Sequence, residues 1–321
     1  MRAIQILGDE SSPEVTISDS MVKPVVHHKE VLVKVYAAGI TGDELLWPEL
    51  YNTATRIPGH EISGVVSATG PDYHGPLEVG QEVFALISAD RGEGQAEYAI
   101  CLADEVALKP ASLSHEEAAA LPIPFLTAWE AIADHGKADP DMRVLITGAS
   151  GAVGSLAVQL ATKMTGCHVI ALASPRNHEY LRKLGAREVL DYNSSGWQHQ
   201  VKDVDLVFDT VGGNVLTSSW EAIKEDGAII TVGDPPPPWA FGGREPAESA
   251  SLPGVRYKHF IVSPSSERLG MLAGMLSDGL IEALAAKLFP VDEAEQAWAH
   301  ARLRNRGPKV VVKFVKATQE D

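Results

Sequence analysis

The stretch VLITGASGAVGSLAVQ (residues 144–159) joins a strand pattern to a helix pattern through a glycine-rich turn. Its first three residues are aliphatic without a break, as is typical of a strand buried on both faces. Three glycines follow at intervals of three, which allows a tight turn, a close approach of a pyrophosphate, and close packing of helix on strand. The helix N-terminus adds free N–H groups. A turn without a ligand is the alternative, but we expect a dinucleotide here, contacted by Gly148, Ser150, Gly151, Ala152, Val153 and Gly154.

The composition limits the class of partner. A chain of 321 residues can form two domains. Its formal charge of −16 argues against nucleic acid and membrane partners, because the summed field repels phosphates. The two cysteines, Cys101 and Cys167, lie far apart in apolar runs, so we expect reduced core residues. With no signal-peptide pattern and no apolar run approaching ~18 residues, a cytoplasmic protein with a small-molecule partner is expected.

The first 110 residues have a β-rich pattern. Short β-branched or alternating runs, separated by Gly, Pro and Asp, predict a small antiparallel barrel or sandwich. These runs are residues 3–7, 31–36, 61–68, 82–87 and 96–101. Only the segment near residues 42–51 leaves room for a crossover helix. We expect this part to be a separate domain.

After Ser114 the spacing of apolar residues changes from one typical of strands to one typical of helices. Ser114 forms a capping-box pattern with Glu117. A second helical stretch covers residues 125–134. Strands then alternate with helices, which predicts a doubly wound parallel sheet. The expected strands are 144–147, 168–173, 188–190, 205–209, 228–232 and 257–262, and the expected helices are 152–164, 177–184 and 215–223.

The last third of the chain completes both parts. A proline-rich segment, residues 234–254, cannot extend the sheet and is either a solvated connector or a rim over the carboxyl end of the strands. Helices at 267–277 and 283–288 and a strand at 308–315 follow, the strand with a possible partner in the first domain. The predicted domains are therefore 1–115, completed by about 264–321, and 116–263.

The residues after the second strand of the parallel sheet predict the cofactor. Dinucleotide folds that prefer NAD carry an acidic side chain about twenty residues beyond the glycines. Here SPRN (residues 174–177) contains no carboxylate. Ser174 can donate a hydrogen bond, Arg176 can pair with a phosphate dianion, and Tyr192 could reach the same phosphate. This pattern favours NADPH; a solvated Arg176 and a Tyr192 that only packs are the alternatives.

Motifs along nearly the whole chain carry a family resemblance. They are VKVYAAGI (33–40) followed by Asp43, PGHE (58–61), VGQEVF (79–84), AAALP (118–122), LTA (126–128), the glycine turn, LGA (184–186) and FDTVGG (208–213). In this order the chain resembles the zinc-independent quinone oxidoreductase (zeta-crystallin-like) and enoyl reductase branch of the medium-chain dehydrogenase/reductase superfamily. The resemblance implies an α/β protein with a GroES-like β-barrel catalytic domain, a Rossmann domain, and commonly a homodimer.

The positions of the catalytic metal ligands decide the expected chemistry. Zinc alcohol dehydrogenases of this superfamily use two cysteines and a histidine, where this chain has Thr41, Ile123 and His60. One histidine beside Glu61 cannot supply three ligands, so we expect no metal and a structural His60. Without a metal Lewis acid, alcohol oxidation cannot stabilise an alkoxide in the usual way. We expect NADPH-dependent hydride transfer to a small hydrophobic acceptor, a quinone or a C=C bond conjugated to a carbonyl.

Two alternative functions stay open at this point. One is a zinc-type alcohol dehydrogenase with unusual ligands, and the other is a non-catalytic NADPH-binding protein with a structural or regulatory role.

The resemblance also implies site residues. Tyr51 could orient or protonate the substrate, or only pack. Thr41 stands where relatives often carry an asparagine beside the nicotinamide, Thr127 resembles a threonine against its ring, and Gly233 would form the opposite wall. The remaining implied cofactor contacts are Val211, Asn305 and Lys309.

Overall fold

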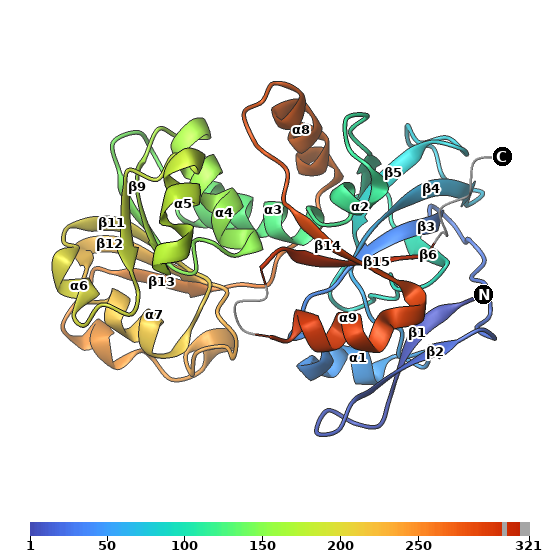
Figure 1. Ribbon diagram of the computed structural model, residues 1–321, viewed down its shortest axis with the longest axis horizontal. Coiled ribbons are helices and arrows are strands. Elements are labelled where there is room, and N and C mark those ends of the chain that lie inside the picture. Colours follow the sequence, from blue (N-terminus) through green and yellow to red (C-terminus); the bar gives the residue numbers. More distant parts are fainter. Residues whose placement is uncertain (304–306, 315–321) are drawn as a thin grey trace. The chain divides into compact units, whose positions relative to one another are not determined.

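The computed structural model describes residues 1–303 and 307–314. Its contacts divide the chain into two compact units (Figure 1). Unit 1 comprises Met1–Leu126 and Ser263–Asp321, and unit 2 comprises Thr127–Val262. The sequence predicts boundaries at residues 115 and 263; in the structure, residues 116–126 belong with unit 1.

Unit 1 contains the predicted GroES-like β domain. A seven-stranded sheet has the order β14-β15-β3-β4-β5-β7, and β6 also pairs with β3. Its strands are β3 (Val31–Gly39), β4 (Glu61–Thr69), β5 (Glu82–Leu86), β6 (Tyr98–Cys101), β7 (Val106–Leu108), β14 (Ala286–Pro290) and β15 (Lys309–Lys313). A separate hairpin joins β1 (Ala3–Leu7) to β2 (Glu14–Ser18). Alternate apolar residues of the sheet strands face a common core, which includes Val33, Ile62, Val83 and Cys101.

The C-terminal strand confirms one prediction and corrects another. β15 pairs antiparallel with β3, so its partner lies in the first part of the chain, as expected. Residues 283–288, predicted as a helix, instead lead into β14, which pairs in parallel with β15. The helical prediction was wrong because a short apolar run fits either period, and pairing with a neighbouring strand decided the outcome.

Unit 1 carries short helices beside this sheet. They are α1 (Pro48–Asn52), α2 (His115–Ala118), α8 (Ser266–Ser277) and α9 (Ala294–Ala301); α3 (Pro122–Trp129) crosses the division between the units. The predicted capping box is confirmed: the Ser114 side chain accepts from the Glu117 N–H, and the Glu117 carboxylate accepts from the Ser114 N–H. β2, β7 and α9 were not predicted.

Unit 2 contains the predicted doubly wound sheet, and all its pairings are parallel. The order is β10-β9-β8-β11-β12-β13. These strands are β8 (Arg143–Ile146), β9 (His168–Ala173), β10 (Glu188–Asp191), β11 (Val204–Asp209), β12 (Ile223–Thr231) and β13 (Arg256–His259). The chain runs outward from β8 to β10 and returns to β11 on the other side. The order therefore reverses between β8 and β11, where open α/β sheets bind ligands at their carboxyl ends.

Helices cover both faces of the unit 2 sheet (Figure 1). α4 (Ala152–Gln159) and α5 (His178–Leu184) lie on one face. α6 (Trp197–Gln200) and α7 (Gly213–Ser219) pack on the other through Trp197, Leu216 and Trp220. α4 continues into a π-helical turn, Leu160–Met164, so the helix predicted over 152–164 is present. The predicted helix 215–223 ends earlier, because Ile223 already begins β12.

The proline-rich segment after β12 forms no strand of the described sheet, as predicted. It contains two short 3₁₀ turns, Ala240–Gly242 and Ala247–Ala250. Trp239 stacks edge-on against Tyr257, and Phe241 against His259. Through these two ring pairs the segment is anchored on β13.

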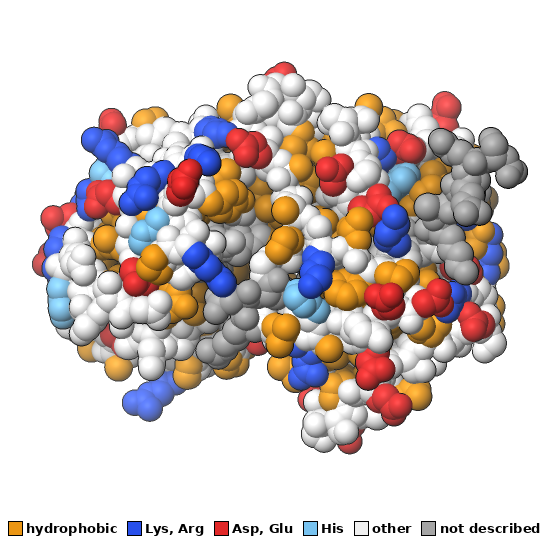
Figure 2. Space-filling model, viewed as in Figure 1, with side chains coloured by type: hydrophobic (Ala, Val, Ile, Leu, Met, Phe, Trp, Pro, Cys, Tyr) orange, Lys and Arg blue, Asp and Glu red, His pale blue; other side chains and the backbone are white. Residues whose placement is uncertain are grey.

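Helix length, surface charge and the two cysteines complete the description of the fold. None of the described helices is both long and apolar enough to cross a bilayer. Acidic and basic side chains are interspersed on the face seen in Figure 2. Cys101 and Cys167 are free and buried, and burial raises the pKa of Cys101, which makes it a poor nucleophile.

Candidate functional site

The glycine turn after β8 has the geometry that its sequence predicts. Gly148 has a φ of 57°, and a Cβ there would collide with the Thr210 hydroxyl. A Cβ on Gly154 would collide with the Gly148 carbonyl oxygen, which shows how closely α4 lies against the turn. At Gly151 the same atom would meet only the Gly148 oxygen, at 3.3 Å. The lack of a side chain at this middle glycine, immediately before the N-terminus of α4, lets an anion approach the backbone.

A buried carboxylate joins the loops at this edge of the sheet. Asp209, the last residue of β11, is fully buried. Its Oδ1 accepts from the Thr147 hydroxyl (2.6 Å) and the Val211 N–H (3.2 Å). Its Oδ2 accepts from the Thr231 hydroxyl (2.7 Å) and the Gly212 N–H (2.9 Å). One side chain therefore ties together the carboxyl ends of β8, β11 and β12.

The predicted cofactor residues Val211 and Gly233 lie in two of these loops. The Gly233 N–H donates to the Thr231 hydroxyl oxygen (2.9 Å). A Cβ on Gly233 would collide with the backbone of Gly212, so the two loops touch. Val211 is exposed beside them. Thr127 is buried in α3.

The residues predicted to read the cofactor's phosphate lie on neighbouring loops. β9 and β10 are in parallel register, with Asp191 paired to Ala173. Ser174 and Tyr192 are therefore the first residues after the carboxyl ends of two neighbouring strands, at the same edge of the sheet. Arg176 is exposed in the turn that follows Ser174, and no ion pair holds it within residues 1–303 and 307–314. The Asn177 amide, which sequence reasoning missed, donates to the Ser150 hydroxyl (2.9 Å) and the Ser174 hydroxyl (3.2 Å).

In unit 1, Thr41 and Lys309 meet at a buried ion pair. The Lys309 Nζ pairs with the Glu61 carboxylate, and the two side chains are 4% and 1% exposed. The same Nζ donates to the Thr41 hydroxyl oxygen (3.3 Å). The other Glu61 oxygen accepts from the Ile123 N–H (3.2 Å). Burial raises the pKa of Glu61, and the ammonium and this N–H oppose the rise.

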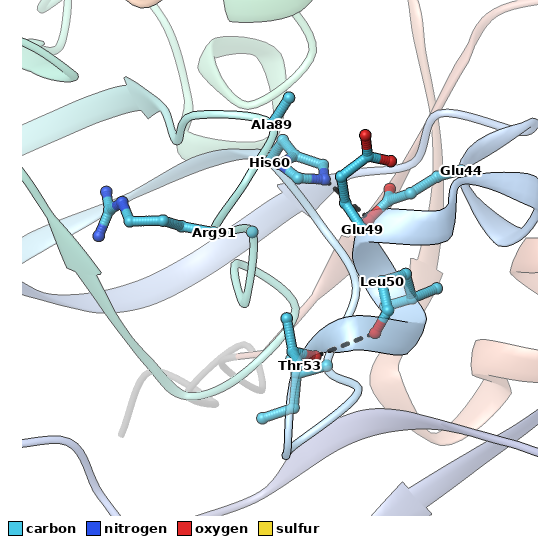
Figure 3. A pocket seen from close by; sticks show the side chains of 9 residues that line it. Glu44, Glu49, Leu50, Thr53, His60, Ala89 and Arg91 are labelled. Carbon is cyan, nitrogen blue, oxygen red and sulfur yellow. Dashed lines mark hydrogen bonds and ion pairs between the residues drawn. The ribbon is translucent and has the colours of Figure 1, made fainter.

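His60 lies in a second buried pair. Its Nε2 is 3.3 Å from the Glu44 carboxylate, and its Nδ1 is 3.3 Å from the Ser88 carbonyl oxygen. Figure 3 shows the two residues beside a cavity of about 10 Å³, room for a single water at most. Burial lowers the pKa of His60, but the Glu44 carboxylate and the hydrogen bonds outweigh it, and the net shift is upward.

These contacts do not fit a catalytic zinc. Thr41 accepts from an ammonium, Ile123 offers no side-chain ligand, and both nitrogens of His60 face acceptors. Nor do the described residues hold any group of three or more His, Cys, Asp or Glu that could bind a metal ion. Of the three ligand positions, only that of His60 carries a residue that binds zinc, and Thr41 and Ile123 cannot complete a three-ligand set.

Tyr51 lies in a packing environment. Its hydroxyl donates to the Leu45 carbonyl oxygen (2.7 Å), and its ring packs at the edge of a core cluster. Burial raises the pKa of this phenol. The proton that a substrate would need is therefore already engaged, which favours the packing interpretation over proton donation. Asn305 lies outside the described residues.

The charge on His60 gives a pH prediction. Because the folded pKa is raised, protonated His60 contributes stability that is complete below its unfolded pKa of about 6.5 and is lost as pH rises through the folded value. We expect His60→Gln to cost about 1–3 kcal/mol near pH 5.5, and less at pH 9. Urea unfolding at both pH values measures this difference. An equal cost at both would show that His60 is neutral.

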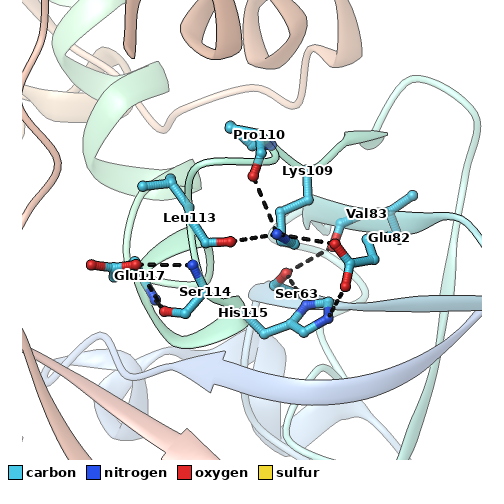
Figure 4. A network of polar contacts seen from close by, with 9 residues as sticks. All are labelled: Ser63, Glu82, Val83, Lys109, Pro110, Leu113, Ser114, His115 and Glu117. Carbon is cyan, nitrogen blue, oxygen red and sulfur yellow. Dashed lines mark hydrogen bonds and ion pairs between the residues drawn. The ribbon is translucent and has the colours of Figure 1, made fainter. Parts of the chain in front are cut away.

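A Ser-His-Glu arrangement elsewhere in unit 1 is structural (Figure 4). The Ser63 hydroxyl lies 2.8 Å from His115 Nδ1, and His115 Nε2 lies 3.3 Å from Glu82. However, Ser63 is fully buried, and its only proton goes to the Val83 carbonyl oxygen (2.8 Å). His115 must therefore donate to the serine instead of activating it. Burial lowers the pKa of His115, and the Glu82 carboxylate opposes this shift. No hydrolase site is formed.

A hollow of about 710 Å³ in unit 2 lies away from the glycine turn. Its lining includes Trp220 and Ile223. Ile223 begins β12, whereas Thr231, at the end of that strand, contacts Asp209. The hollow therefore lies toward the amino ends of the strands, the edge opposite the turn.

Comparisons with known proteins match family models to both the first and the second part of the chain. The alcohol dehydrogenase GroES-like domain model matches residues 27–112, and the zinc-binding dehydrogenase model matches residues 184–312. The chain is 30% identical to the mouse "NAD(P)H oxidoreductase RTN4IP1, mitochondrial", over 93% of this chain and 85% of the relative. It is 29% identical to a "probable zinc-binding oxidoreductase, mitochondrial" of Arthroderma benhamiae, over 89% and 88%.

A solved structure extends the likeness to the whole fold. The quinone oxidoreductase of Coxiella burnetii has a TM-score of 0.80 and 25% identity, covering 98% of this chain and 100% of that one. The matched models and the full-length relative are those of one superfamily. This chain is an oxidoreductase and belongs to the medium-chain dehydrogenase/reductase superfamily, in its zinc-independent quinone and enoyl reductase branch.

Proposed function

We propose that the protein reduces a quinone, or a C=C bond conjugated to a carbonyl, with NADPH. The observation that carries the cofactor assignment is the loop after β9, where Ser174 and exposed Arg176 stand in place of an acidic residue. Relatives named NAD(P)H oxidoreductase or quinone oxidoreductase support the reaction class. Bound NADPH would supply the hydride, and the enolate or hydroquinone anion that results would take its proton from water.

The described residues suit the binding and orientation of this cofactor. The N–H groups at the start of α4 and the backbone of Gly151, which carries no side chain, suit the pyrophosphate. The Asp209 contacts fix the loops that hold Val211 and Gly233, so the cofactor would be held in one geometry. Because the zinc positions carry no ligand set, the acceptor must already be electrophilic. A small hydrophobic acceptor meets this need.

The reaction is tested by NADPH consumption against quinones, enones and enoyl thioesters, followed by product identification. Turnover of one of these classes supports the proposal. Alcohol oxidation that depends on stoichiometric zinc and is abolished by a chelator would instead show a zinc-type enzyme. Tight NADPH binding without turnover of any acceptor would favour a structural or regulatory role.

The proposal includes a homodimer and a cytoplasmic location. Two relatives carry "mitochondrial" in their names, so the location needs its own measurement. Sedimentation and cell fractionation test these two points. A monomer, or recovery in the mitochondrial fraction, would contradict them.

Arg176→Ala tests the phosphate contact. We expect NADPH binding to weaken by about 1–3 kcal/mol, the usual contribution of a hydrogen bond to a charged group, with NADH binding unchanged. Fluorescence titration of both cofactors measures this. Arg182→Ala, also exposed but near the end of α5, is the control and should change neither affinity. Equal losses for both cofactors would show that Arg176 does not read the phosphate.

A further inference from the structure

Asn177 connects the two loops that the proposed function assigns to NADPH. Its Nδ2 donates to Ser150 in the glycine turn (2.9 Å) and to Ser174 after β9 (3.2 Å). The backbone reinforces the connection, since the Ala149 N–H donates to the Leu172 carbonyl oxygen (3.2 Å) and the Asn177 N–H to that of Ser174 (2.9 Å). The two hydroxyls are therefore held on either side of one amide group.

Asn177 does this instead of capping its helix. It precedes α5, but its backbone continues the 3₁₀ turn Pro175–Asn177 with helical angles (φ −101°, ψ −1°), unlike the extended backbone of an asparagine that accepts from the first-turn N–H groups. No such bond is formed by its side chain in this structure. The amide is directed away from the helix and toward the two serines, which indicates a role in the loops.

Because the amide is the donor in both bonds, each serine hydroxyl is left with a proton that it can donate. A serine hydroxyl has one proton to donate and two lone pairs to accept with. Because the amide donates to both oxygens, each serine has used a lone pair and keeps its proton. Ser155, by contrast, donates its proton to the Ala152 carbonyl oxygen (3.2 Å). Ser150 and Ser174 thus present two O–H donors, and exposed Arg176 lies in the turn that Ser174 begins.

Nearby carboxylates have their own partners. Asp191 accepts from the Asn193 N–H (2.9 Å) and side chain (3.1 Å). Glu179, in the first turn of α5, pairs with Lys183 (3.0 Å). The donors around Asn177 can therefore serve an external anion.

We infer that Asn177 is a specificity-determining positioning residue, which holds Ser150 and Ser174 as hydroxyl donors for the 2′-phosphate of an adenosine cofactor. The inference rests on the proposed function, because it requires a cofactor that carries this phosphomonoester. It adds Ser150 to the phosphate contacts and explains how a loop with one arginine can recognise a dianion. The group that touches the ligand is the serine pair, and Asn177 acts through it.

The test is calorimetric binding of adenosine 2′,5′-bisphosphate and 5′-AMP to the full chain. The wild type should prefer the bisphosphate by about tenfold or more, as expected for charge-assisted hydrogen bonds. Asn177→Asp offers two acceptor oxygens, so both serines turn their protons inward, and it adds a negative charge. This variant should lose most of the preference, with 5′-AMP affinity unchanged. Asn52→Asp, which adds the same charge at an exposed position of α1, should behave like the wild type.

Further variants keep the inference open to contradiction if Asn177→Asp folds poorly. Ser150→Ala and Ser174→Ala should each reduce the preference several-fold, and Asn177→Ala should reduce it through lost orientation. Retention of the wild-type ratio by Asn177→Asp and Asn177→Ala would overturn the inference while leaving the NADPH proposal intact. A wild type that does not distinguish the two nucleotides would instead contradict the proposed cofactor itself.

Discussion

Replacing Lys309 with Met is expected to lower the free energy of unfolding by about 3–5 kcal/mol, because it leaves the buried Glu61 carboxylate without its counter-ion. Water cannot replace the ammonium, since Glu61 is almost completely inaccessible. Urea unfolding of the variant and the wild type measures the loss. Lys313→Met, four residues along β15, is the control: its pair with Glu116 is partly exposed and should contribute less than about 1 kcal/mol.

The cost of Lys309→Met should depend on pH in a defined direction. Burial already raises the pKa of Glu61, and Lys309 opposes this. Without the lysine the folded pKa rises further above the unfolded value, so the folded state holds a proton that the unfolded state releases. Stability then falls as pH increases through that interval. The variant should therefore be more strongly destabilised at pH 8 than at pH 5.

A double variant separates stability from cofactor binding. Lys309→Met with Glu61→Gln removes both charges and keeps an oxygen to accept from the Ile123 N–H. We expect most of the lost stability to return, because a neutral pair of similar volume requires no desolvated charge. Weaker NADPH binding by this stable protein than by the wild type would support the expected contact of Lys309 with the cofactor. A double variant as unstable as the single one would contradict the ion-pair explanation.

The sequence could predict those helices and strands in which apolar residues recur at a regular spacing. The strand 168–173 agrees with β9 residue for residue, and the glycine turn lies between strand and helix as expected. Residues 283–288 failed because their apolar positions fit either period and the choice depended on β15, a contact that is not local. β2 was missed because its side chains are only half-buried, which leaves a weak alternation to detect.

The residues of the candidate site also fall into two groups: those that a local sequence pattern identifies, and those that only the fold brings together. Ser174 and Arg176 could be found because they follow a strand at a known distance from the glycines. Asn177 gave no such signal, since its partner Ser150 lies 27 residues away. The ion pair of Glu61 with Lys309 spans most of the chain, and only the fold brings the two together. Asp209 lay within the quoted FDTVGG motif, but its role depends on hydroxyls from two other strands.

Asp209→Asn should weaken binding of NADPH and NADH by the same factor. The carboxylate accepts four hydrogen bonds, whereas an amide presents one oxygen and one NH₂ group. A threonine hydroxyl can rotate to accept from this NH₂, but a backbone N–H cannot. Val211 and Gly212 donate to different oxygens of Asp209, so in the asparagine variant one of these two N–H groups faces the side-chain NH₂ and loses its acceptor. We expect the loop of Val211 to move, and with it part of the wall for the cofactor.

The effect on stability should rank the variants. Asp209→Ala leaves several buried donors unsatisfied at about 1–3 kcal/mol each, so a loss of at least about 3 kcal/mol is expected. Asp209→Asn should cost less, and Thr147→Val, which removes one of the four partners, should cost least. Urea unfolding gives this order, and fluorescence titration gives the two affinities.

The ratio of the two affinities makes the Asp209 prediction specific. Asp209 joins the ends of β8, β11 and β12, whereas Ser174 and Arg176 follow β9. Ser150 follows β8, but its contact to the phosphate loop is through Asn177 and not through Asp209. A change at Asp209 should therefore reduce binding without changing the preference for NADPH, the reverse of the result expected for Asn177→Asp. If Asp209→Asn altered the preference, the two sets of loops would be coupled through the glycine turn, and the phosphate contacts could not be assigned to Ser150, Ser174 and Arg176 alone.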